Sequence, residues 1–150
     1  MKMFFPRSHE MKVFLDTPVI VSAAAVRGLC ADVLREVLAY HELVLSIPVI
    51  AELNTILFTQ LNLPDDIITE SIGFLYHDAH VSERFSRIDV DINDKEDILI
   101  LSSAINGDAE LFVTGDDELL GLEKMNGMEI VSPRMFWQKV KDKSSEAIIP

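Results

Sequence analysis

Short apolar runs alternate along this chain with segments whose apolar residues recur every three or four positions. The runs lack the polar alternation of a half-exposed strand, so they predict strands that are buried on both faces. These predicted strands occupy residues 13–15, 43–45, 111–114 and 128–131, and a further short strand is predicted at 79–82.

The intervening segments have the apolar spacing of amphipathic helices. Ser46 is a favoured N-cap residue, and Pro18 and Pro48 suit a first helical turn. Strands that alternate with helices predict an α/β fold, in which a central parallel sheet of about five strands has helices on both faces. The predicted helices cover residues 19–25, 31–41, 48–61, 64–76, 94–105, 117–122 and 133–140.

The length of 150 residues suits a single domain with a substantial core. We assign that domain to residues 11–141. Residues 1–10 precede a strand that is already complete, so we expect an N-terminal extension outside the core, and Met11 is a second candidate start. Residues 142–150 are expected to form a frayed C-terminal tail.

Composition narrows the class of protein. Hydrophobic residues make up 49% of the chain, which indicates a globular protein, and 25 acidic against 13 basic residues give a formal charge of -12. Such a surface repels nucleic acid at long range, so a nucleic-acid substrate would require cations or a basic partner. Cys30 is the only cysteine, which favours a reducing, cytoplasmic compartment. The apolar runs are too short to predict a membrane span.

Two acidic residues follow predicted strands directly. Asp16 comes after the first strand and Asp116 after the fourth. Ligands of open parallel sheets bind beyond the carboxyl ends of the strands, so both acids are placed where a ligand would lie. Taken alone, each is better explained as a helix N-cap, whereas two such acids after buried strands favour a ligand site about as much as two caps. Taken alone, Glu52 is explained as a solvated surface glutamate. Asp97 is explained as an acid in a first helical turn, where the helix dipole favours negative charge.

Carboxylates that converge in one place repel one another, and a divalent cation removes this penalty. Ligation by carboxylates alone favours hard ions such as Mg²⁺ or Mn²⁺, which commonly act on phosphates. Other constellations are weak. The four histidines are dispersed, and the sequence has neither a phosphate-binding glycine loop nor a dinucleotide fingerprint.

Four stretches together resemble the PIN-domain nucleases, the family of the VapC-type toxins. The first has the pattern of the family's opening strand, which usually ends in Asp-Thr-Asn, and the second carries Glu52 in a helix. The third is the family's most specific segment, and the fourth resembles its closing strand and helix. They read MKVFLDTPVIVSA, RGLCADVLREVLAYHELVLSIPVIAELNTIL, DKEDILILSSAINGDAELFVTGDDELL and MEIVSPRMFWQKV.

The resemblance implies roles for individual residues, with Mg²⁺ or Mn²⁺ as the cofactor. Thr17 and Thr114 would not bind the metal themselves but would orient its ligands or a water by hydrogen bonds. Asp117 would be a fifth acid near the metal-binding acids. Pro18 departs from the family pattern, which has asparagine or serine there, and this removes a side-chain hydrogen bond near Asp16. The catalytic and metal-binding acids would be Asp16, Glu52, Asp97 and Asp116.

The same resemblance implies a metal-dependent endoribonuclease. A metal-activated water would attack an RNA phosphodiester and leave a 5′-phosphate and a 3′-hydroxyl. It also implies a homodimer and a role as the toxin of a toxin–antitoxin pair, with an antitoxin protein as partner. The alternative is a non-catalytic PIN-fold binding module with weak or absent nuclease activity, which Pro18 and the charge of -12 favour.

Overall fold

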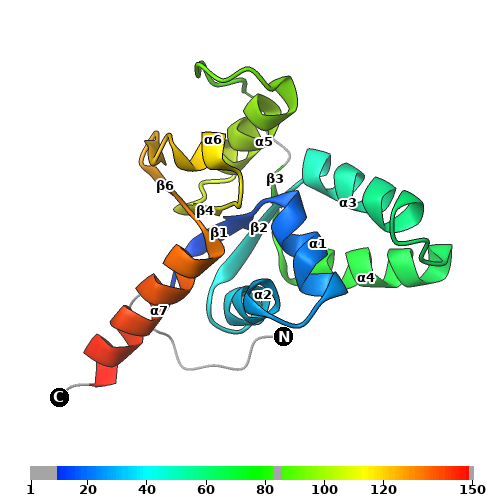
Figure 1. Cartoon of the computed structure of the whole chain (residues 1–150), viewed down its shortest axis with the longest axis horizontal. Helices are drawn as coiled ribbons and strands as arrows, with labels where there is room; N and C mark the ends of the chain where they lie inside the picture. Colours follow the sequence, from blue (N-terminus) through cyan, green and yellow to red (C-terminus); the bar gives the residue numbers. More distant parts are fainter. Residues whose placement is uncertain (1–9, 83–85, 149–150) are drawn as a thin grey trace.

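The computed structural model describes residues 10–82 and 86–148, so the predicted extension at 1–10 lies almost wholly outside the described residues. The strands form one sheet in the order β3-β2-β1-β4-β6-β5 (Figure 1). Five of them are parallel, as the sequence predicts. Their bounds are β1 Lys12–Leu15, β2 Glu42–Ser46, β3 His80–Ser82, β4 Leu111–Val113, β5 Lys124–Met125 and β6 Met128–Val131.

The strand β5 is a sixth strand that the periodicity did not predict. It pairs antiparallel with β6, and Met125 lies opposite Met128. The two residues between them, Asn126 and Gly127, have φ angles of 50° and 85°. Positive φ at both positions of a two-residue loop is typical of a tight hairpin turn, for which Asn-Gly is the favoured sequence.

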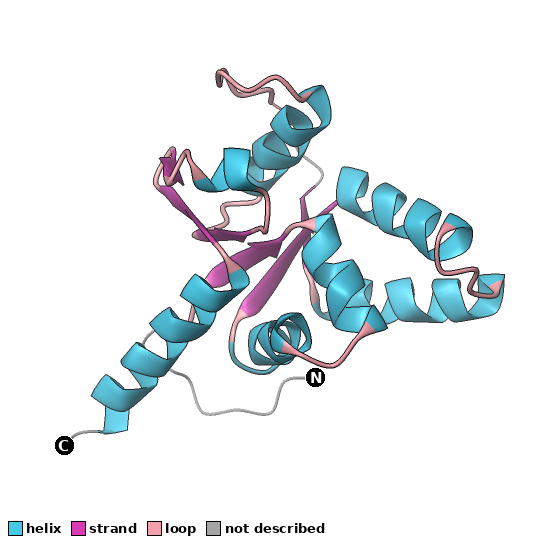
Figure 2. Ribbon diagram, in the orientation of Figure 1, coloured by secondary structure: helices cyan, strands magenta, loops and turns pink. Residues whose placement is uncertain are grey.

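Helices fill the segments between the strands, largely where the periodicity predicts them (Figure 2). The final helix continues past its predicted end near residue 140. In the described part of the chain, no single helix is long and apolar enough to cross a membrane, and α1 with α2 passes that test only as a pair bent by 106°. The bounds are α1 Thr17–Ala25, α2 Leu29–Tyr40, α3 Ile47–Thr59, α4 Asp65–Asp78, α5 Lys95–Asn106, α6 Asp117–Leu120 and α7 Pro133–Ile148.

The helices cover the sheet in layers. In Figure 1, α5 and α6 lie above the sheet, whereas α2 and α7 lie below it. The helices α3 and α4 pack against each other at the right of the view, and α1 contacts both α2 and α3. This arrangement buries the central strands on both faces, which explains why their sequences are continuously apolar.

The core is centred on the two middle strands. Phe14 of β1 and Phe112 of β4 are register partners, fully buried, and their rings stack with centroids 5.2 Å apart. Gly107, which ends α5, lets this helix approach the sheet closely, because a Cβ there would come within 2.7 Å of Val44 Cγ1. The stacked rings thus join β1 and β4 at the centre of the core, and Gly107 lets the end of α5 lie against β2.

Candidate active site

The order of the strands changes direction between β1 and β4. From β1 the chain proceeds through β2 to β3 at one side, and then crosses back to β4 on the other side of β1. Helices on opposite faces leave a crevice at such a switch point, beyond the carboxyl ends of the strands. Leu15 and Val113 are register partners at these ends, so the residues that follow them are neighbours.

Asp16 follows β1 and is 7% exposed. Its backbone N–H donates to the carbonyl of Val113 at 2.9 Å. Its Oδ1 accepts from the N–H of Thr17 at 3.0 Å and so caps α1, and its Oδ2 accepts from the hydroxyl of Thr114 at 2.8 Å. Asp16 therefore caps α1 and also lies at the switch point of the sheet, so its role as a cap does not exclude a role in a site.

Asp116 stands in a similar position after β4. Its Oδ1 accepts from the backbone N–H groups of Glu118 at 2.8 Å and Leu119 at 3.2 Å, so it caps α6. Its own N–H donates to Thr114 Oγ1 at 3.1 Å. Thr114 is fully buried, and its hydroxyl therefore joins the strand ends that carry the two aspartates.

Glu52 reaches the same place from α3. Ser46 caps this helix with its hydroxyl, which accepts from Val49 N–H at 3.4 Å, and Pro48 lies in the first turn. Glu52 Oε1 accepts a 2.8 Å hydrogen bond from the hydroxyl of Thr17. The first residue of α1 thus orients a carboxylate that lies 35 positions further along the chain.

Asp97 comes from the first turn of α5. The helix cap is Asp94, whose Oδ1 accepts from the N–H groups of Glu96 at 2.9 Å and Asp97 at 3.4 Å. Asp97 and Glu96 of α5 line the cavity at the switch point, and Asp94 does not.

One cavity of about 380 Å³ collects the four predicted acids. Glu96 also lines it, whereas Asp117 is exposed at the start of α6 and does not. The sequence offered one signal for Glu96, its place in the first turn of α5 beside Asp97. The full lining is Asp16, Pro18, Glu52, Glu96, Asp97, Ile100, Gly115 and Asp116.

The acids disfavour one another's charge. Burial raises the pKa of Asp16, and the carboxylates of Glu52 and Asp116 raise it further, against the hydrogen bonds from Thr114 and Thr17. Burial also raises the pKa of Asp97 to about 6, with added repulsion from Asp94, Asp116 and Asp16. A cation among these groups would stabilise their ionised forms.

The chemistry of this donor set suits a hard divalent ion, because carboxylate oxygens are the ligands that Mg²⁺ and Mn²⁺ prefer. The side chains as they stand do not form a closed ligand shell. Among residues 10–82 and 86–148, no three acidic, histidine or cysteine side chains are close enough together to hold one ion. The geometry therefore brings the four acids to one cavity without showing a metal site.

Two solved structures have the same fold. One is a chain in the crystal structure of VapBC2 from Rickettsia felis, which is bound to a DNA fragment from the VapBC2 promoter. It is 16% identical to this chain with a TM-score of 0.55, and the match covers 81% of this chain and 98% of that one. The other is a chain of VapBC-1 from nontypeable Haemophilus influenzae, at 17% identity and a TM-score of 0.58, covering 83% and 99%. No family model and no curated protein matches the sequence. The chain has the PIN-type α/β fold of the VapC-type proteins.

Proposed function

We propose that this protein is a PIN-type endoribonuclease that requires Mg²⁺ or Mn²⁺. The observation that carries the proposal is the convergence of Asp16, Glu52, Asp97 and Asp116 from four different elements on one cavity at the switch point of the sheet. Strand topology alone brings Asp16 and Asp116 together, but Glu52 and Asp97 reach the same cavity from two separate helices. Four carboxylates in one cavity would attract a divalent cation, which would in turn bind a phosphate.

The chain's own residues hold the carboxylates in place. Thr17 fixes Glu52, and Thr114 fixes Asp16 while it accepts the N–H of Asp116. Mg²⁺ or Mn²⁺ held by the four acids would neutralise charge on the phosphodiester and make water more acidic. Burial and the neighbouring carboxylates raise the pKa of Asp97 in the metal-free protein, and the same cation would hold its carboxylate ionised.

The biological role that we propose is that of a toxin with an antitoxin partner, acting on RNA as a homodimer in the cytoplasm. The support is the likeness in fold to chains of two VapBC complexes, one of them crystallised with promoter DNA. An antitoxin with a basic surface would offset the charge of -12. Expression in a bacterial host should arrest growth, and Asp16→Asn should relieve the arrest.

A second function is favoured by particular residues at the same cavity. Pro18 lines it where the family pattern has a polar side chain, and none of the lining residues is a lysine or arginine. A nuclease site without a nearby cation binds the RNA backbone weakly. These features favour a non-catalytic binding module that keeps the fold and the acids.

Cleavage of single-stranded RNA in Mn²⁺ separates the two functions. The acids act as a unit, so each of four variants should lose about 10²-fold or more of the rate. Asp65→Asn, at the start of α4, is the matched control. Asp94→Asn is a second control, because asparagine also caps helices well. The four variants are Asp16→Asn, Glu52→Gln, Asp97→Asn and Asp116→Asn.

An EDTA blank separates this activity from metal-independent ribonucleases. Cleavage that persists in EDTA, or that is equal in the wild type and all four variants, would contradict the nuclease proposal. A folded wild type that shows no metal-dependent cleavage would support the non-catalytic binding module instead.

A further inference from the structure

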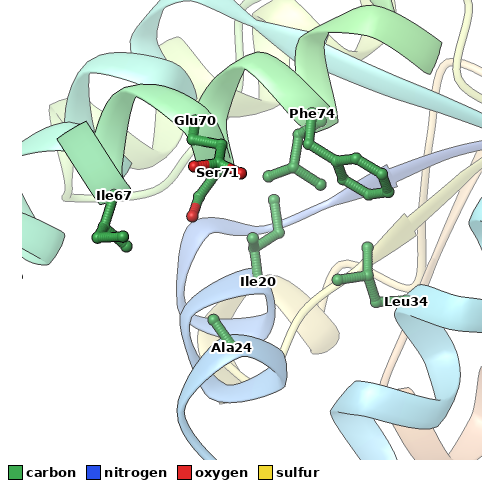
Figure 3. Close-up of a pocket in the computed structure, with 8 residues that line it drawn as sticks. Ile20, Ala24, Leu34, Ile67, Glu70, Ser71 and Phe74 are labelled. Carbon is green, nitrogen blue, oxygen red and sulfur yellow. The ribbon is translucent and has the colours of Figure 1, made fainter.

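An apolar groove lies between α1, α2 and α4, away from the acidic cavity. Its volume is about 460 Å³. Ile20 of α1, Leu34 of α2 and Phe74 of α4 point into a common space (Figure 3). The groove adjoins a smaller hollow of about 70 Å³ toward α3, and the two share Ile20, Ala24, Ser71 and Leu75.

Large apolar side chains that line the groove are exposed to solvent. Phe74 is 63% exposed and Ile67 is 42% exposed, although both line it. A continuous apolar patch beside a hollow is typical of a surface that another segment covers.

Among the described residues, the one charged residue that lines the groove is acidic. Glu70 lines it, and Asp66 lies one turn earlier on the same face of α4. Neither α1 nor α4 carries a lysine or arginine, and Arg35 of α2 is paired with Asp32. A second copy of this chain would bring acids against acids, so the groove fits an occupant that is apolar and basic.

Residues 1–9 of this chain have that chemistry. Their sequence, MKMFFPRSH, contains two basic residues and no acidic residue. The large apolar side chains among them are Met1, Met3, Phe4 and Phe5.

The start of the described chain is also near enough to the groove. The N–H of Met11 donates to His41 Nδ1 at 3.1 Å, at the end of α2. Leu34 lies seven positions before His41 on α2, which corresponds to roughly 10 Å along a helix. Nine extended residues span up to about 30 Å, so they can reach Leu34 and cross to α4.

We propose that residues 1–9 occupy the groove between α1, α2 and α4, with Phe4 and Phe5 against Phe74 and Ile67 and with Lys2 or Arg7 near Glu70. The segment then belongs to the folded protein, and any partner that binds this face must displace it. The proposal is independent of the nuclease assignment, because it involves none of the residues of the acidic cavity.

Hydrogen–deuterium exchange of the full chain tests the proposal. Replacing the two aromatic residues, as Phe4→Ser/Phe5→Ser, should make the amides of residues 67–75 exchange at least about threefold faster, at every protein concentration. A synthetic peptide of residues 1–10, added to this variant, should restore the slower exchange. Exchange at the amides of β1 and β4, which lie in the core, should stay unchanged and serves as an internal check of the fold.

A comparison of groove and control variants locates the contact. Phe74→Ser should accelerate exchange by itself. Adding Phe4→Ser/Phe5→Ser should then have no further effect, because the effects of substitutions at contacting residues are not additive. The matched control is Phe58→Ser on α3, which is 58% exposed and does not line the groove, and it should leave the effect of the double variant intact.

Two results would overturn the proposal. One is unchanged exchange at 67–75 in the Phe4→Ser/Phe5→Ser variant. The other is protection in the wild type that disappears on dilution, since a second copy would then be the occupant.

Discussion

Thr114 Oγ1 donates a 2.8 Å hydrogen bond to Oδ2 of Asp16, across the boundary between β4 and β1. The two residues are 98 positions apart in sequence, and both are buried. The same hydroxyl accepts the N–H of Asp116 at 3.1 Å. One hydroxyl thus holds two acids of the cavity in register, although it is not among the groups that line the cavity.

Replacing Thr114 by valine should damage the cavity while keeping the shape of the side chain. Asp16 would lose the hydrogen bond that lowers its pKa, and the part-buried N–H of Asp116 would lose its acceptor. We expect a loss of about 1–3 kcal/mol in the free energy of unfolding and at least about tenfold in RNA cleavage. Chemical denaturation and the cleavage assay measure the two effects.

The control for Thr114→Val is Thr55→Val on α3. The hydroxyl of Thr55 donates to the Ala51 carbonyl at 3.1 Å on an exposed face. This variant should retain wild-type cleavage and nearly wild-type stability. Equal losses in both variants would show that Thr114 has no particular role in the cavity.

Divalent metal should stabilise the folded protein. A ligand that binds only the folded state adds about 2.7 kcal/mol at a hundred times its dissociation constant. Thermal melts with Mn²⁺ should therefore show a higher Tm than melts in EDTA, and Asp16→Asn should abolish the increase whereas Asp65→Asn should not. An unchanged Tm of the wild type at saturating Mn²⁺ would count against metal binding by the four acids.

Replacing Asp97 by asparagine should stabilise the metal-free protein near neutral pH. The pKa of Asp97 is raised from 3.8 to about 6, so the folded state binds this proton more tightly than the unfolded state does. The ionised carboxylate therefore destabilises the fold above about pH 6, and this penalty vanishes below about pH 4. Asp97→Asn should raise the Tm by about 1–3 °C at pH 7 and leave it unchanged at pH 4.

Asp94→Asn is the comparison for Asp97→Asn, since Asp94 caps α5 at an exposed position. Its substitution should change the Tm much less at pH 7. A large loss of stability on Asp97→Asn, at any pH, would identify Asp97 as a structural residue.

The positions of the main elements could be predicted because strands buried on both faces have a simple pattern. The sequences around Phe14, Val44 and Phe112 are apolar without interruption, and the one around Ile130 is interrupted only by Glu129; each forms a strand of the central sheet. Once these strands are parallel, acids that follow them must meet at one edge. The convergence of Asp16 and Asp116 follows from that rule together with the order of the strands.

The partners of the acids could not be predicted, because they depend on contacts between distant residues. The hydrogen bond from Thr17 to Glu52 requires a definite angle between α1 and α3, which periodicity does not encode. The strand β5 was missed for a different reason. It is only two residues long, although the turn sequence Asn126-Gly127 that forms its hairpin was visible in the sequence.

The effect of Pro18 decides between the nuclease and the binding module. Pro18 lies in the first turn of α1 and lines the cavity. A backbone N–H in a first helical turn has no partner within the helix, so proline costs the helix little there, and asparagine should be tolerated. If the missing polar side chain limits activity, Pro18→Asn should increase RNA cleavage by about threefold to tenfold, because it supplies a hydrogen bond beside Asp16.

Pro48→Asn is the matched control for Pro18→Asn. Pro48 occupies the corresponding first turn of α3 but does not line the cavity. Both variants lose the restriction that proline places on the unfolded chain, so each should cost about 0.4–1 kcal/mol in the free energy of unfolding. Only Pro18→Asn should change cleavage. If neither the wild type nor Pro18→Asn cleaves RNA in Mn²⁺ while both remain folded, the defect is not confined to Pro18, and the cavity serves binding alone.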